Sequence, residues 1–243
     1  MTAVTPTHDL AIAPSPNSQF QRVLIVIAAY NEAEAIGAVV SELLPHYSQV
    51  VVVDDGSSDD TARVALQAGA CVLTHFINRG QGAALQTGIT YALTQGADYV
   101  VTFDADGQHD VADIAHLLAP IREGRAHIAL GSRFLERREK IPFGRRIVLF
   151  FAVVFTRLMA RARLTDAHNG LRAFSRFSAE RIDLQLDRMA HASEIVDQVV
   201  ASGLPYIEVP VRIRYTAYSL RKGQRSSAAF RVAFDYLMAR LTR

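Results

Sequence analysis

Short apolar runs alternate with segments of helical periodicity through the first half of the 243-residue chain. The runs lie at 22–30 (RVLIVIAAY), 49–53 (QVVVV), 71–76 (CVLTHF) and 98–103 (DYVVTF), and apolar residues recur at helical spacing between them. Strands that are apolar on both faces are typical of a parallel sheet covered by helices. The alternation therefore predicts an α/β fold with a mostly parallel sheet flanked by helices.

A polar cluster follows each of these runs. The clusters are AAYNE (28–32), DDGSSDDT (54–61), NRGQG (78–82) and DADGQHD (104–110). In open parallel sheets, ligands bind beyond the carboxyl ends of the strands, and those ends meet at one edge. We therefore expect the four clusters to line one ligand cleft.

The formal net charge of +2 conceals a strong asymmetry along the chain. Residues 1–119 hold 3 Lys and Arg against 13 Asp and Glu, whereas residues 120–165 hold 11 against 3. Residues 205–243 are again basic, with 8 against 2. An acidic first half suits a metal ion, and a basic second half suits an anionic partner.

Three segments lie outside the alternating pattern. Residues 1–21 are a Pro, Ser and Thr mixture without the order of a signal peptide, so we expect a disordered leader. Residues 141–164 are basic and apolar, and both a core helix and a helix lying in a membrane interface fit them. Residues 226–243 predict a C-terminal amphipathic helix. The single cysteine, Cys71, allows no internal disulfide, which suits the cytoplasm.

Two pairs of carboxylates stand at strand ends. Asp54 and Asp55 lie where a base or ribose can be bound, while helix capping explains the Ser and Asp residues just after them. Asp104 and Asp106 have two interpretations. Asp-x-Asp-Gly carries the nucleophile of haloacid dehalogenase-like phosphatases, and Asp-x-Asp holds a divalent cation in GT-A glycosyltransferases. The phosphatase motif normally opens its domain and continues with Thr or Ser, so the late position and Gln108 favour the transferase.

The motifs taken together resemble those of family 2 glycosyltransferases. The matching segments span residues 22–235 and are, in order, AAYNEAEAI, VVVVDDGSSDDT, NRGQGAAL, DADGQHD, GSRF, DAHNGLRAFSR and YTAYSLRKGQ. They look most like the dolichyl-phosphate mannose synthase-like branch, which glycosylates polyprenyl phosphates. The resemblance implies a GT-A (Rossmann-like) fold. It also implies an inverting, metal-dependent hexosyltransferase with a GDP- or UDP-linked sugar as donor and a polyprenyl phosphate as acceptor.

The resemblance further implies which residues form the site. The nucleotide sugar would be bound by a set in the donor half, residues 22–119: Ala28, Tyr30, Glu32, Asp54, Asp55, Arg79 and Asp104. Asp104, Asp106 and Gln108 would hold Mg²⁺ or Mn²⁺, which prefer hard oxygen ligands. The acceptor phosphate would be bound by cations of the acceptor half, residues 120–235: Arg133, Arg145, Arg146, Arg172 and Lys222. The residues implied to carry the reaction are Asp104, Asp106, Arg133 and Glu194, with Glu194 acting as a base only for a hydroxyl acceptor.

Some neighbouring residues have weaker assignments. His109 and Asp110 are expected to begin the next helix. His109 is expected to lie behind the metal ligands and not to bind the metal itself. Asp166, Asn169 and Gly170 resemble a loop that closes over the sugar. Residues 219–227 resemble a mobile basic segment over the phosphates, and an exposed loop fits them equally. The chain departs from the family at position 107, often Leu, Met or Phe but here Gly, and at position 81, often basic but here Gln.

Other functions stay open at this point. The chain could transfer sugar to a saccharide hydroxyl in cell-envelope polysaccharide synthesis, serve as a catalytically silent membrane scaffold, or, least in keeping with its motifs, act as a phosphatase. We expect a cytoplasmic protein bound peripherally to the inner face of the cell membrane. A membrane-protein partner and a homo-oligomer are left open, and no nucleic acid is expected as a partner.

Overall fold

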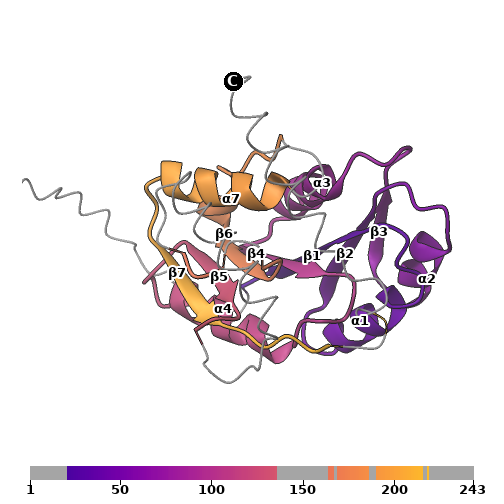
Figure 1. Cartoon of the computed structure of the whole chain (residues 1–243), viewed down its shortest axis with the longest axis horizontal. Coiled ribbons are helices and arrows are strands. Elements are labelled where there is room, and N and C mark those ends of the chain that lie inside the picture. The colour runs from indigo at the N-terminus through magenta and orange to yellow at the C-terminus, as the bar shows by residue number, and fades with distance from the viewer. Residues whose placement is uncertain (1–20, 136–163, 167–168, 186–189, 216–217, 219–243) are drawn as a thin grey trace, which may run out of the picture.

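The computed structural model describes residues 21–135, 164–166, 169–185, 190–215 and 218. Within these residues the chain forms a seven-stranded sheet in the order β3-β2-β1-β4-β6-β5-β7, with helices on both faces (Figure 1). The predicted α/β fold with a mostly parallel sheet is confirmed.

The first four strands run parallel and form the half of the sheet that follows the predicted apolar runs. They are β1 (Val23–Ala29), β2 (Gln49–Asp54), β3 (Cys71–Thr74) and β4 (Tyr99–Asp104). β1 pairs with β2 on one side and with β4 on the other, and β2 pairs with β3. The carboxyl ends of these strands therefore meet at one edge, where Ala28 of β1 lies opposite Asp104 of β4.

The second half of the sheet contains a strand of opposite direction. It consists of β5 (Ile128–Ser132), β6 (Arg172–Ser175) and β7 (Tyr206–Pro210). β6 lies between β4 and β5 and is antiparallel to both, whereas β7 is parallel to β5. Because β6 runs the other way, its first residue, Arg172, lies at the edge where β4 and β5 end. This strand was not predicted from the sequence.

Helices cover both faces of the sheet and enclose a hydrophobic core on each (Figure 1). One core lies under α1 (Ile36–Leu43), α2 (Thr61–Gln67) and α4 (Ala112–Arg122). The other lies under α3 (Gln81–Thr94), α6 (Arg176–Ala179) and α7 (Ala190–Ala201). α3 packs very closely on β1, since a Cβ at Gly88 would overlap the side chain of Val26. Both faces of the sheet are thus filled by apolar packing, which leaves its edges for polar chemistry.

Several predictions concern parts of the chain that are not described. The leader (1–21), the basic apolar segment (141–164) and the C-terminal helix (226–243) lie, apart from Gln21 and Leu164, outside the described residues. Where helices are described, none combines the length and the apolar character needed to cross a bilayer.

Candidate active site

The loop after β4 carries the three predicted metal ligands. The backbone turns at Gly107, whose φ of 73° lies in the left-handed region that favours glycine. Oδ1 of Asp106 accepts the backbone N–H of Gln108 at 3.0 Å, which closes the turn. This conformation gives a physical reason for the glycine at position 107. The turn places Asp104, Asp106 and Gln108 on one short loop.

The two carboxylates of this loop repel each other. Burial raises the pKa of Asp106, and the charge of Asp104 raises it further. A cation between them would remove that repulsion, and carboxylate and amide oxygens suit Mg²⁺ or Mn²⁺. Across the described ranges, no three His, Cys, Asp or Glu side chains gather as a metal-binding group. The loop therefore fits a cation that completes its coordination with substrate oxygens, as Mg²⁺ commonly does.

His109 lies behind Asp104, and its predicted place at the start of a helix was wrong. Its Nε2 lies 2.8 Å from Oδ2 of Asp104, its side chain is 2% exposed, and its ring packs edge-on against Phe103. The backbone of His109 instead forms an antiparallel bridge with Ile213, and α4 begins only at Ala112. Pairing with the later segment keeps this residue extended, so its imidazole is buried and bonded to a predicted metal ligand.

Gly170 lies directly against the carboxylate of Asp104. A Cβ at this glycine would overlap both carboxylate oxygens. The carbonyl oxygen of Gly170 accepts the Thr102 hydroxyl at 2.7 Å, which ties the loop to β4. The segment before β6, predicted to close over the sugar, thus forms a wall beside Asp104.

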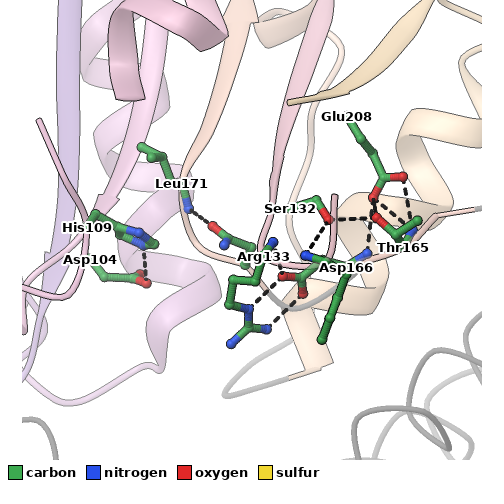
Figure 2. A network of polar contacts seen from close by, with 10 residues as sticks. Asp104, His109, Ser132, Arg133, Thr165, Asp166, Leu171 and Glu208 are labelled. Carbon is green, nitrogen blue, oxygen red and sulfur yellow. Dashed lines mark hydrogen bonds and ion pairs between the residues drawn. The ribbon is translucent and has the colours of Figure 1, made fainter. Parts of the chain in front are cut away.

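Arg133 follows β5 and is held by Asp166 (Figure 2). Its Nε and Nη2 donate to the two oxygens of that carboxylate at 2.6 and 2.8 Å, and its backbone N–H donates to Oδ2 at 3.1 Å. Burial acts to lower the pKa of Arg133, but the bonds and charge of Asp166 outweigh it and hold the pKa above its ordinary value. The guanidinium is therefore charged and fixed, and its Nη1 is not used by Asp166.

Arg172, the first residue of β6, is a buried cation. Its side chain is 3% exposed, and burial lowers its pKa to about 10, although the charges of Asp104 and Asp166 oppose that shift. Nη1 of Arg172 has no hydrogen-bond partner in the described part of the chain. A buried charge with an unused donor is costly unless an anion pairs with it. These properties suit the phosphate-binding role expected of this residue.

Asp54 and Asp55 at the end of β2 are both buried and bonded within the protein. Asp54 accepts the hydroxyl of Ser57. Asp55 accepts from the backbone N–H groups of Arg79 and Gly80 at 2.9 and 2.7 Å, and its Oδ1 lies 2.7 Å from Nδ1 of His75. Asp55 therefore fixes the loop that leads into α3, and its predicted contact with the nucleotide stays a prediction.

The sequence analysis gave no role to His75. It stands one residue after β3 at the same edge, and its Nε2 lies 2.9 Å from Oγ1 of Thr87 in α3. A polar residue directly after a strand was the signal that could have identified it. With Asp55, His75 braces the predicted nucleotide side of the site.

The other predicted nucleotide ligands follow β1 and β3. Tyr30 is 46% exposed and Arg79 is exposed, so both side chains are accessible at the edge. Glu32 is bonded instead to a distant residue, since the hydroxyl of Tyr218 donates to its Oε2 at 2.5 Å. The chain after β7 thus returns across the carboxyl edge of the sheet, where the N–H of Arg214 also donates to the carbonyl oxygen of Gln108 at 2.7 Å.

Glu194 occupies α7, on the face of the sheet covered by α3. Its side chain is 3% exposed, and its two oxygens accept the backbone N–H of Gln185 at 3.1 and 3.2 Å. This contact holds the segment that follows α6, and the role of Glu194 as a base stays a prediction. Three predicted phosphate ligands, namely Arg145, Arg146 and Lys222, lie outside the described residues.

These features together define a class of protein. A mostly parallel α/β sheet carries an Asp-x-Asp loop at its carboxyl edge, where the half-buried Arg133 follows β5 and the buried Arg172 begins β6. That arrangement is the one expected of a GT-A sugar transferase. Residues 24–183 match the family described as glycosyl transferase family 2, and the chain belongs to this family of glycosyltransferases.

Relatives and solved structures agree with this assignment. The chain is 31% identical to a UDP-N-acetylglucosamine–dolichyl-phosphate N-acetylglucosaminyltransferase of Methanococcus voltae, over 90% of this chain and 96% of that protein. It is 30% identical to a polyprenol monophosphomannose synthase of Mycolicibacterium smegmatis, over 92% and 90% of the two chains.

Among solved structures, glucosyl-3-phosphoglycerate synthase of Mycobacterium tuberculosis, crystallised with Mn²⁺, UDP and glucosyl-3-phosphoglycerate, has a TM-score of 0.62 at 19% identity. The match covers 89% of this chain and 80% of that one. At this identity the likeness establishes a shared fold.

Proposed function

We propose that the protein transfers a sugar from a nucleotide-sugar donor to a polyprenyl phosphate, with inversion and with a divalent cation. Two relatives that span nearly the whole chain are named for dolichyl-phosphate and polyprenol substrates. Their names specify different sugars, N-acetylglucosamine and mannose, so the proposal leaves the sugar and the base open. Because nucleotide sugars are cytoplasmic and polyprenyl phosphates are held in membranes, we place the reaction at the cytoplasmic face of the membrane, with the protein bound peripherally.

One observation carries this proposal: Arg172 of β6 pairs in register with Thr102, two residues before Asp104 on β4, and Arg133 follows the end of β5 on the other side of β6. A carboxylate loop suited to a cation and a pair of arginines suited to an anion therefore lie within electrostatic range of each other. A transferase that brings a nucleotide diphosphate to a phosphate nucleophile requires this juxtaposition of opposite charges. A saccharide hydroxyl carries no charge to pair with the buried Arg172, whereas an acceptor phosphate does.

The residues of the site have separate tasks in this proposal. Asp104, Asp106 and Gln108 would hold the cation, which when bound neutralises charge on the departing diphosphate. Arg133 and Arg172 would bind and orient the acceptor phosphate through charge-assisted hydrogen bonds. A phosphate monoester has a second pKa of about 6 and is already anionic at neutral pH, so the nucleophile needs no strong base. Residues 22–119 would thus serve the donor and residues 120–235 the acceptor.

A transfer assay tests this proposal. The purified full chain would be incubated with Mn²⁺, undecaprenyl phosphate and a panel of UDP- and GDP-linked sugars, and lipid-linked sugar would be measured. We expect product with at least one donor, loss of product with EDTA, and loss in Asp106→Asn. The matched variant Glu123→Gln, which alters an exposed ion pair with Arg125, should keep activity.

The other outcomes identify the alternatives. Transfer to an oligosaccharide but not to the lipid would contradict the polyprenyl acceptor. Release of phosphate from simple phosphomonoesters without a donor would indicate a phosphatase. Liposome binding without any thermal shift on adding a nucleotide would indicate a scaffold.

A further inference from the structure

Glu208 of β7 lies at the centre of a hydrogen-bonded network that leads to Arg133. It pairs in register with Leu130 of β5, so it lies next to the strand that ends at the site. Its carboxylate accepts the backbone N–H of Thr165 at 2.8 and 3.0 Å, the Thr165 hydroxyl at 2.9 Å and the N–H of Asp166 at 3.1 Å (Figure 2). One carboxylate thus holds two consecutive residues of the loop before β6.

The hydroxyl groups of this network have a defined direction. Because Thr165 donates its hydroxyl proton to Glu208, its oxygen must accept from the hydroxyl of Ser132, 2.6 Å away. Oγ of Ser132 in turn accepts the N–H of Phe134 at 3.3 Å. The series of hydrogen bonds from Phe134 through Ser132 and Thr165 therefore ends on the carboxylate of Glu208, which accepts hydrogen bonds and donates none.

The network continues from the loop to the predicted phosphate ligand. The N–H of Asp166 is fixed by Glu208, and the carboxylate of Asp166 fixes the backbone and the guanidinium of Arg133. Glu208 is therefore connected to Arg133 through a single intermediate residue. It touches neither the carboxylate loop nor Arg133 in the contacts described here.

We infer that Glu208 is a positioning residue that sets the direction of the Arg133 guanidinium toward the acceptor phosphate. This role rests on the proposed function of Arg133. A bidentate arginine recognises phosphate through the direction of its donors, so a small rotation of the fork weakens binding without removing its charge. The network fixes that direction from a strand at the edge of the sheet.

The Glu208→Gln variant keeps the shape of the side chain and changes its chemistry. The amide would place its own NH₂ against an N–H of Thr165 or Asp166, so at least one bond to the loop is lost. We expect KM for undecaprenyl phosphate to rise by about tenfold or more, the loss typical of a hydrogen bond to a charged group. KM for the nucleotide sugar should stay at the wild-type value. Glu208→Asp retains the carboxylate, so its KM for undecaprenyl phosphate should lie between those of the wild type and of Glu208→Gln. Glu123→Gln is the control for the same substitution at an exposed position.

A second readout is independent of the acceptor. Hydrogen exchange of single backbone amides, followed by NMR, should show faster exchange in Glu208→Gln at Thr165 and Asp166, and also at Arg133, whose N–H is bound to Asp166. Amides of β1 should keep their protection, which shows that the fold is intact. Unchanged exchange at Arg133, or equal rises in both KM values, would overturn the inference.

The two readouts also separate the failure of the inference from failure of the proposed function. If wild-type protein transfers no sugar to polyprenyl phosphate while exchange at Arg133 still responds to Glu208→Gln, the acceptor assignment is wrong and the positioning of Arg133 stands. If the wild type is active and exchange at Arg133 does not respond, the positioning role is wrong.

Discussion

Gly170 and the carboxylate of Asp104 are in such close contact that the loop before β6 has no room for a side chain at that point. The two residues are 66 positions apart in the sequence, and the antiparallel course of β6 brings them together. The contact leaves the carboxylate of Asp104, a predicted metal ligand, little room to rotate, and its contact with His109 restrains it further. Backbone packing is thus one of the forces that orient this carboxylate.

Gly170→Ala should therefore displace Asp104. The added methyl group overlaps both carboxylate oxygens, and a displacement of that kind in an active site can lower the rate by about 100-fold. Gly203→Ala is the control, because a Cβ there meets no atom within 4 Å, although its φ of 65° makes the substitution mildly strained. Transfer rates and thermal midpoints of both variants would be compared. Full activity of Gly170→Ala would show that the position of Asp104 is not critical.

His109→Gln should weaken binding of the metal–nucleotide complex. The imidazole orients Asp104 through a 2.8 Å contact, and loss of such an outer partner typically lowers metal affinity by about 10- to 100-fold. Titration calorimetry with Mn²⁺ and UDP measures this directly. His116→Gln serves as a control, since His116 is largely exposed on α4. Wild-type affinity in His109→Gln would contradict the orienting role of this residue.

Arg133→Lys should weaken binding of the acceptor and leave binding of the donor unchanged. Lysine retains the charge but cannot make the paired bonds to Asp166 or present a fork to phosphate. We expect KM for polyprenyl phosphate to rise about tenfold with KM for the donor unchanged. Arg125→Lys, at an exposed ion pair, should alter neither value. A rise confined to the donor KM would show that Arg133 serves the donor and would contradict its role in binding the acceptor.

Arg172→Met should lower the transfer activity without lowering the stability of the fold. Methionine has a similar length, and it removes the free-energy cost of a buried charge whose Nη1 has no hydrogen-bond partner in the described part of the chain. Asp166 keeps Arg133 as a partner and Asp104 keeps His109, so each carboxylate retains a hydrogen-bond partner. We expect an equal or higher thermal midpoint and at least about a tenfold loss of transfer. A strongly destabilised variant would indicate that Arg172 serves the fold.

The sequence predicted the parallel half of the sheet well, for physical reasons. β1, β2 and β4 are continuous apolar runs that are buried on both faces of the sheet. Such a run can be recognised from the local sequence alone. β6 was missed because it is short, and its neighbours, β4 and β5, come from distant parts of the chain. Strand direction in such a case depends on long-range pairing, which periodicity does not encode.

The site was predicted unevenly for the same reason. Asp104, Asp106 and Gln108 occur within one motif, so the sequence alone placed them on one loop. The network of Glu208, Thr165 and Asp166 joins segments more than 40 residues apart, and no local pattern marks Glu208 as polar support for Arg133. Only the backbone of His109 was predicted wrongly, because its conformation depends on the bridge to Ile213.

The central claim is that the acceptor is a phosphate held by Arg133 and Arg172. It is tested most directly by comparing undecaprenyl phosphate with undecaprenol, which differ only in the phosphate, as acceptors for the wild-type protein with Mn²⁺ and its preferred nucleotide sugar. We expect sugar on the phosphorylated lipid alone, through a bond that mild acid cleaves. Equal transfer to the free alcohol would contradict it.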